Sequence, residues 1–341
     1  MEQILKSRYR IGDKISENPF SVTYKGFYIG TDKPVIIKIY KRGTLNSSLI
    51  REMKQKVKDF SIINHHGIAK IIDGDYGWQG FYYVREFIAG QSLQEIMERG
   101  EKIGVEKALA IADQVLAALE LVHSKKIVHA ALKPSNIFID DQGIVKLTDF
   151  VIESEVKYSM PQKVVEIMQN AKYASPEELE GSPASSASDI FSLGLILFEM
   201  AAGKPIFASA GLAENAKKVK AASIVLPEAS PALPRYLMEI ISKAVQKDPI
   251  LRFGSASQLR DSLEKKLLPP AASPGEEYLK IFESSVTQFG GEEIDKESEV
   301  LQDVGRVRLR WSKEKHRNWI LAMVVGASVL LGILYSFFLG R

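Results

Sequence analysis

A long apolar stretch limits the architectures open to this chain more than any other part of it. Residues 319–339 read WILAMVVGASVLLGILYSFFL and contain no charged side chain. As a helix they would extend about 31 Å, which matches the hydrocarbon thickness of a bilayer. Trp319 and Tyr335 lie near its ends, where interfacial aromatic side chains are favoured. The stretch predicts one transmembrane helix over residues 319–339.

A cluster of positive charge, residues 306–318, precedes this stretch. Its basic residues are Arg306, Arg308, Arg310, Lys313, Lys315 and Arg317. Such a flank favours the cytoplasmic side and contacts anionic lipid headgroups. The formal net charge is only +3, so the rest of the chain is mildly acidic, which argues against a nucleic-acid partner. We expect a single-pass protein of the inner (plasma) membrane, with a cytoplasmic folded part and its C-terminus outside.

Composition excludes several kinds of site. The chain has no cysteine, which rules out disulfides, thiolate metal sites and cysteine nucleophiles. Its histidines follow no zinc-ligand spacing, so we expect no metal site. Ser328, Gly332 and Ser336 recur every four residues in the apolar stretch, a spacing that allows two helices to approach and form a homodimer.

The remaining chain changes character along its length. Residues 8–92 contain β-branched and aromatic runs typical of strands, with one helical pattern at 47–63. From residue 93 onward, apolar residues recur at helical intervals. This order predicts an α+β architecture. The expected parts are a folded domain at 1–268, an acidic linker with an apolar face that could dock as a helix at 269–305, the basic segment at 306–318 and the transmembrane helix at 319–339.

Six short motifs occur in a recognisable order. They are VIIK at 35–38, HAALKPSNIFI at 129–139, DFV at 149–151, SPE at 175–177, SDIFSLGLILFEM at 188–200 and DPILRF at 248–253. Their order and spacing resemble the protein kinase family, and the wording around residues 123–150 is most similar to the eukaryotic-like Ser/Thr kinases of bacteria. The resemblance implies a bilobal fold with a β-rich lobe followed by a larger helical lobe.

The resemblance also assigns roles to individual residues. Lys38 matches the lysine that holds the α- and β-phosphates of ATP, and Asn136 and Asp149 match the two metal ligands. Ala130 and Ala131 stand where the family has arginine and the aspartate base. Because Ala131 has no proton acceptor, and a general base contributes about 10²–10⁴-fold in rate, we expect no catalytic residue at this position.

The nucleotide pocket departs further from the family pattern. Ser16, Asn18 and Ser21 replace the three glycines of the phosphate-covering loop. Ile36 replaces the small residue above adenine, Phe138 replaces the floor leucine, and Arg85 lies at the gate of the back pocket. Overfilling a packed site costs about 1–3 kcal/mol, so we expect a blocked adenine pocket with neither ATP nor magnesium bound.

Other positions match residues that support the fold. Glu177 and Arg252 match a structural ion pair, and Asp189 matches the residue that braces the catalytic loop. Trp78, Leu132 and Phe150 are expected in the core. The glutamate that should pair with Lys38 is ambiguous, because the expected position carries Lys56, whereas Glu52 lies one turn earlier.

The leading hypothesis from sequence is a membrane-tethered pseudokinase, not an enzyme, that scaffolds or regulates a partner protein such as an active kinase or an envelope complex. One alternative is a non-catalytic sensor of ATP and magnesium that uses Lys38, Asn136 and Asp149. The other is an atypical active Ser/Thr kinase with a different carboxylate as its base.

Overall fold

The computed structural model divides the chain into two compact units, Met1–Ile281 and Phe282–Arg341. The residues it describes, all in the first unit, are 3–18, 20–101, 103–150, 172–207, 219, 224, 226 and 233–268. The predicted linker, basic segment and transmembrane helix lie outside these residues. Within them, no helix has both the length and the apolar character needed to cross a membrane.

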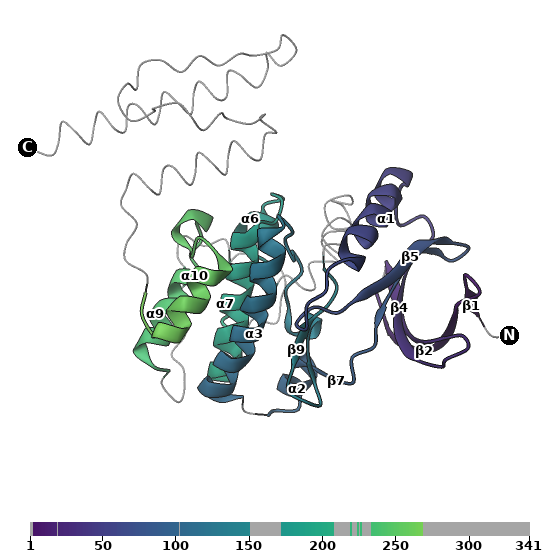
Figure 1. The fold of residues 1–341 in the computed structure, drawn as a ribbon. Helices are drawn as coiled ribbons and strands as arrows, with labels where there is room; N and C mark the ends of the chain where they lie inside the picture. Colours follow the sequence, from purple (N-terminus) through teal and green to yellow (C-terminus); the bar gives the residue numbers. More distant parts are fainter. Residues whose placement is uncertain are drawn as a thin grey trace, which may run out of the picture. The chain divides into compact units, whose positions relative to one another are not determined.

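A six-stranded antiparallel sheet forms the N-terminal part, with strand order β1-β2-β3-β4-β6-β5 (Figure 1). Its strands are β1 (Ile4–Leu5), β2 (Tyr9–Glu17), β3 (Ser21–Tyr28), β4 (Pro34–Lys41), β5 (Ile71–Gly77) and β6 (Gly80–Glu86). Helix α1 (Ser47–Ser61) begins after Asn46, whose side chain accepts a hydrogen bond from the Leu49 amide and so caps the helix. This order confirms the predicted run of strands with one helix.

The C-terminal part is mainly helical. A small sheet joins β7 (Gly90–Ser92), β8 (Ile137–Asp140) and β9 (Val145–Leu147). The helices are α2 (Leu93–Glu98), α3 (Gly104–Ser124), η1 (Pro134–Asn136), α6 (Pro176–Leu179), α7 (Ser186–Ala202), α9 (Arg235–Ala244), η4 (Pro249–Leu251) and α10 (Ala256–Lys265). Helix α7 is buried almost all round, as expected of a helix that is apolar on every face. It packs against both α3 and α9.

The side chains of strand β4 lie alternately on two faces of the sheet, and only one of these faces packs into the hydrophobic cluster of the sheet. Val35, Ile37 and Ile39 pack with residues of β6 into one hydrophobic cluster. Because side chains alternate along a strand, Ile36 and Lys38 project to the opposite face of the sheet. The functional side chains are therefore carried by a strand whose other face is fixed in the core.

The predicted core is correct at two positions and wrong at one. Leu132 and Phe150 are each 3% exposed, as expected. Trp78 is 62% exposed, because it lies in the turn between β5 and β6 rather than on the inward face of a strand.

Candidate nucleotide and catalytic site

Lys38 reaches the site through the register of two central strands. On β4, Lys38 lies opposite Tyr83 of β6, and Ile36 lies opposite Arg85. Directly opposed residues share a face, as do alternate residues, so these four side chains project to the same side of the sheet. The Lys38 side chain is 6% exposed, and its Nζ donates to Asp149 Oδ2 at 3.1 Å.

The Asp149 carboxylate interacts with three side chains of the six-stranded sheet. Its Oδ2 accepts from Lys38, its Oδ1 accepts from the Tyr83 hydroxyl, and the Arg85 Nε lies 3.8 Å from the same Oδ1. Burial by itself raises the pKa of Asp149, but the Lys38 and Arg85 charges and the Tyr83 hydroxyl outweigh burial and hold that pKa below the ordinary carboxyl range. Asp149 is therefore an anion in the folded protein.

Tyr83 keeps its proton in this arrangement. Burial, reinforced by the Asp149 charge, raises the pKa of Tyr83 well above its ordinary value. The hydroxyl therefore remains a donor to Asp149, and the negative charge of the cluster stays on the carboxylate.

Asp189 holds the backbone of the loop that contains Ala130 and Ala131. Its Oδ2 accepts from the His129 amide at 2.8 Å and its Oδ1 accepts from the Ala130 amide at 2.9 Å. Ala130 has φ +60°, a left-handed conformation that is uncommon outside glycine. This confirms the predicted bracing role of Asp189. Asp189 holds this loop conformation although Ala130 and Ala131 stand where the family pattern has arginine and aspartate.

Asn136 is positioned by the same loop. It is 3% exposed, and its Nδ2 donates to the Ala131 carbonyl at 2.8 Å. This hydrogen bond orients the amide so that Oδ1 is the atom available to coordinate a cation. Asn136 and Asp149 together supply an amide oxygen and a carboxylate.

These donors fit a magnesium ion that is shared with a phosphorylated ligand. Magnesium prefers oxygen ligands and is held in phosphoryl-transfer sites by one or two carboxylates together with substrate phosphates. Over the described ranges, no cluster of three or more His, Asp or Glu side chains could hold a metal. Asp149 and Asn136 are therefore suited by donor type to a cation whose remaining ligands would come from a bound molecule and water.

The three residues of the predicted blocked pocket lie near one another. Ile36 and Arg85 are buried at 6% and 7% exposure, and they are paired across β4 and β6. The Arg85 guanidinium carbon lies 5.5 Å from the centre of the Phe138 ring, a cation–π contact. The exclusion of adenine by these side chains stays a prediction.

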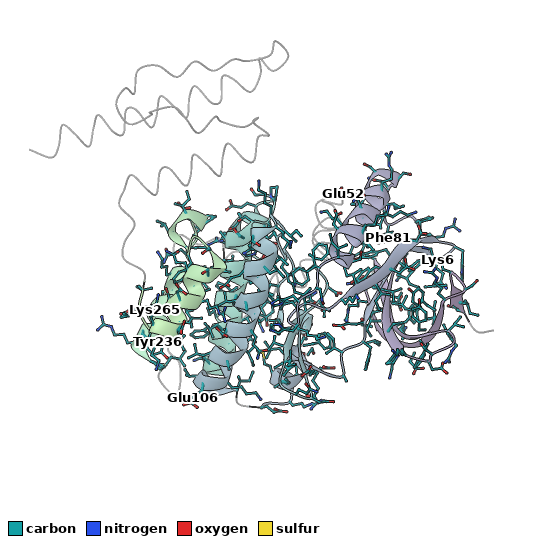
Figure 2. The ribbon with its side chains drawn as sticks, viewed as in Figure 1. Lys6, Glu52, Phe81, Glu106, Tyr236 and Lys265 are labelled. Atoms are coloured by element: carbon teal, nitrogen blue, oxygen red, sulfur yellow. The ribbon has the colours of Figure 1, made fainter. Side chains whose placement is uncertain are left out.

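Glu52 and Lys56, the two α1 residues considered for the position of the glutamate that should pair with Lys38, pair with each other. Glu52 Oε1 lies 3.6 Å from the Lys56 Nζ one turn along the helix, and Glu52 is labelled in Figure 2. Lys38 meanwhile pairs with Asp149.

Sequence reasoning missed Tyr83 and the contact between Arg85 and Asp149. The strand FYYVRE was recognised, and its alternation places Tyr83 and Arg85 on one face. Their proximity to Lys38 depends on the register between β4 and β6, which no motif in the sequence reports. Arg85 was consequently interpreted only as an obstruction.

The ion pair between Glu177 and Arg252 is confirmed. Arg252 has no exposed side-chain surface, and its two terminal nitrogens donate to the Glu177 carboxylate at 2.7 and 2.8 Å. This bidentate pair joins α6, which contains Glu177, to the residue that follows η4.

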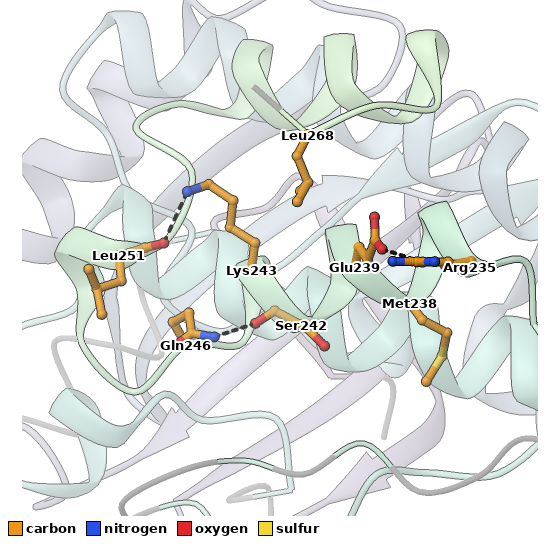
Figure 3. A pocket seen from close by; sticks show the side chains of 8 residues that line it. All are labelled: Arg235, Met238, Glu239, Ser242, Lys243, Gln246, Leu251 and Leu268. Atoms are coloured by element: carbon orange, nitrogen blue, oxygen red, sulfur yellow. Dashed lines mark hydrogen bonds and ion pairs between the residues drawn. The ribbon is translucent and has the colours of Figure 1, made fainter. Parts of the chain in front are cut away.

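A separate hollow lies along α9, η4 and the end of α10 (Figure 3). Arg235 there pairs with Glu239 at 2.8 Å, and the Lys243 Nζ donates to the Leu251 carbonyl at 3.3 Å. Both cations are thus engaged by their own chain. The hollow shares no residue with the cluster around Asp149.

The Lys38–Asp149 contact joins the N-terminal sheet to the segment after β9, and Asp189 braces the loop before η1. A family model for the protein kinase domain matches residues 9–263. The chain belongs to the protein kinase family.

Relatives with similar sequences are named serine/threonine-protein kinases, in agreement with this family. A probable serine/threonine-protein kinase of Clostridium acetobutylicum is 29% identical over 76% of this chain and 40% of its own length. Serine/threonine-protein kinase PrkC of Bacillus subtilis is 28% identical over 97% of this chain and 52% of its own length. PknA of Mycobacterium tuberculosis is 30% identical over 76% and 61%, respectively. The chain thus spans about half the length of the relatives it matches.

These comparisons contradict the pseudokinase hypothesis and the expectation that the chain is not an enzyme. The relatives are named as serine/threonine-protein kinases, and none is described as lacking activity. The hypothesis rested on the joint loss of the base at Ala131, of the three loop glycines and of the small residues around adenine. In phosphoryl transfer most of the catalysis comes from positioning and charge stabilisation rather than from a base. The Lys38–Asp149 ion pair is present in this chain.

Proposed function

We propose that this chain is an atypical Ser/Thr protein kinase that transfers phosphate from ATP slowly. The observation that carries the proposal is the 3.1 Å contact between the Lys38 Nζ and Asp149 Oδ2, with Asp149 held ionised. A cation and an anion fixed at this distance provide the two charges that a triphosphate and its counter-ion require.

Each residue has a distinct role in the proposed reaction. Lys38 orients the nucleotide phosphates, and Asp149 and Asn136 would hold a magnesium ion, which when bound neutralises charge on the phosphates. The substrate Ser or Thr Oγ forms a bond to the γ-phosphorus while the bond to the β–γ bridging oxygen breaks and ADP leaves. Because Ala131 cannot accept a proton, the hydroxyl proton passes to a phosphate oxygen or to water.

The substituted pocket is consistent with slow turnover. In this proposal Ile36 and Phe138 reduce the space for adenine, which weakens nucleotide binding without removing the phosphate-binding charges. The missing base lowers the rate by about 10²–10⁴-fold relative to a kinase that has one. These effects reduce the rate of phosphoryl transfer, whereas loss of Lys38 or Asp149 would abolish it.

Substitution of Lys38 tests the proposal. The full-length Lys38→Met variant is expected to lose phosphorylation of a Ser/Thr-rich acceptor, measured by mass spectrometry after incubation with ATP and magnesium. Lys41→Met is the matched control, because Lys41 lies on the same strand but pairs with Glu17 at 2.7 Å at the exposed end. Equal phosphorylation by the wild type and Lys38→Met would refute the assignment.

We also propose that residues 319–339 anchor this kinase in a bacterial inner membrane. The apolar run and the basic cluster at 306–318 support this placement. Expressed in a bacterium, the wild type is expected in the membrane fraction after a high-salt wash, whereas a variant lacking 319–339 is expected in the soluble fraction. Recovery of both proteins in the same fraction would contradict the proposal.

A further inference from the structure

Arg85 is a buried cation with spare hydrogen-bonding capacity. Its Nη1 donates to the Glu86 carbonyl at 3.2 Å, but its Nε has no hydrogen-bond acceptor among the described residues. A buried donor without an acceptor is uncommon and calls for a physical explanation. Asp149 Oδ1 lies 3.8 Å from this Nε, within the range of an ion pair but beyond that of a hydrogen bond.

Both oxygens of Asp149 already face positive or donating groups. Lys38 is on Oδ2, and Tyr83 and Arg85 are on Oδ1. A divalent cation held by Asp149 needs one of these oxygens. It would therefore sit within a few ångströms of a fixed guanidinium in a site shielded from water, where like charges repel strongly.

We propose that Arg85 is a positioning residue that stands in for one divalent cation at Asp149. Its fixed charge orients the carboxylate and lowers the affinity of Asp149 for a divalent metal. The next part of the inference rests on the proposed function. Arg85 makes nucleotide binding less dependent on a metal ion than it is in a kinase that has a neutral residue at this position.

Manganese binding to the full-length protein without nucleotide tests the inference directly. Free Mn²⁺ is measured by electron paramagnetic resonance during titration of each variant. Arg85→Met is expected to bind Mn²⁺ about tenfold more tightly than the wild type, which corresponds to about 1.4 kcal/mol of removed repulsion. Arg85→Lys keeps the charge and is expected to resemble the wild type.

Matched variants identify the source of the change. Arg260→Met removes an arginine from a different carboxylate, Asp113, which it contacts at 2.6 Å, and is expected to leave Mn²⁺ affinity unchanged. Adding Asp149→Asn to Arg85→Met is expected to remove the gain. Thermal melting confirms that each variant is folded, and Arg85→Gln is the second neutral variant in case Arg85→Met is not.

Two results of the Mn²⁺ titration would overturn the inference. Equal Mn²⁺ affinity of the wild type and the folded neutral variant, or no binding by either, overturns the inference. A separate titration with fluorescent ADP at low and high Mn²⁺ examines the nucleotide. If no variant binds ADP, the proposed function fails, while the comparison without nucleotide still decides the role of Arg85.

Discussion

Replacing Arg252 with alanine is expected to lower the free energy of unfolding by about 3–5 kcal/mol. The Arg252 side chain is fully buried and donates to both oxygens of Glu177 and to the carbonyls of Ala187, Gln246 and Lys247. Its guanidinium also lies 4.8 Å from the centre of the Phe191 ring. Truncation removes all these contacts at once and leaves Glu177 as a largely buried anion without its partner.

A second arginine in the same lobe provides the control. Arg260 pairs with Asp113, but the two side chains are 36% and 52% exposed. An exposed pair is worth about 0–1 kcal/mol, so Arg260→Ala is expected to be nearly neutral. Urea unfolding of the full-length variants, followed by far-ultraviolet circular dichroism, measures both. A similar decrease in the free energy of unfolding in the two variants would show that the Glu177–Arg252 pair stabilises the fold no more than an exposed pair does.

Substituting Ala131 with aspartate is expected to raise the rate of phosphoryl transfer by about 10²–10⁴-fold. The loop that carries Ala131 is already braced, because Asp189 accepts from the two preceding backbone amides. A carboxylate at Ala131 would supply the missing acceptor for the substrate hydroxyl proton. The rate is measured at saturating nucleotide, so that weak binding does not mask the change.

The Ala131→Asn variant distinguishes the effect of a proton acceptor at this position from the effect of a larger side chain. Ala131→Asn has nearly the size of the aspartate variant but cannot take the proton, so it is expected to stay near the wild-type rate. If both substitutions accelerate transfer equally, the gain does not come from a general base. If Ala131→Asp gives no gain at saturation, the loop does not present this position to the acceptor hydroxyl.

The features predicted correctly from sequence are those carried by local motifs. The strand around Lys38, the loop at Asn136 and the buried aspartate at Asp189 each lie in a short recognisable segment. Their order along the chain was sufficient to predict the bilobal fold. The Glu177–Arg252 pair also followed from two such motifs, although these residues lie far apart in the sequence.

The features that were missed depend on pairing between distant segments. Tyr83 and Arg85 reach Asp149 only because β6 lies beside β4 in one particular register. A shift of one residue would turn both side chains to the opposite face. Trp78 was misplaced because an aromatic residue was assumed to be inside, whereas the turn between β5 and β6 exposes it.

The functional error has a different physical origin. Loss of the base, of the loop glycines and of the small residues around adenine was together taken as loss of activity, although a base accounts for only part of the acceleration in phosphoryl transfer. Lys38, Tyr83 and Arg85 all contact or approach the Asp149 carboxylate, so its surroundings keep two positive charges and a hydroxyl donor despite the loss of the base.

The most direct test of the central claim is a time course of radiolabelled γ-phosphate transfer from ATP by the full-length protein and its Asp149→Asn variant. The acceptor is a Ser/Thr-rich protein, and label on the chain itself is counted separately. We predict slow, linear incorporation by the wild type and none by Asp149→Asn. Incorporation that is absent from the wild type, or identical in the two proteins, would contradict the claim that Asp149 supports phosphoryl transfer.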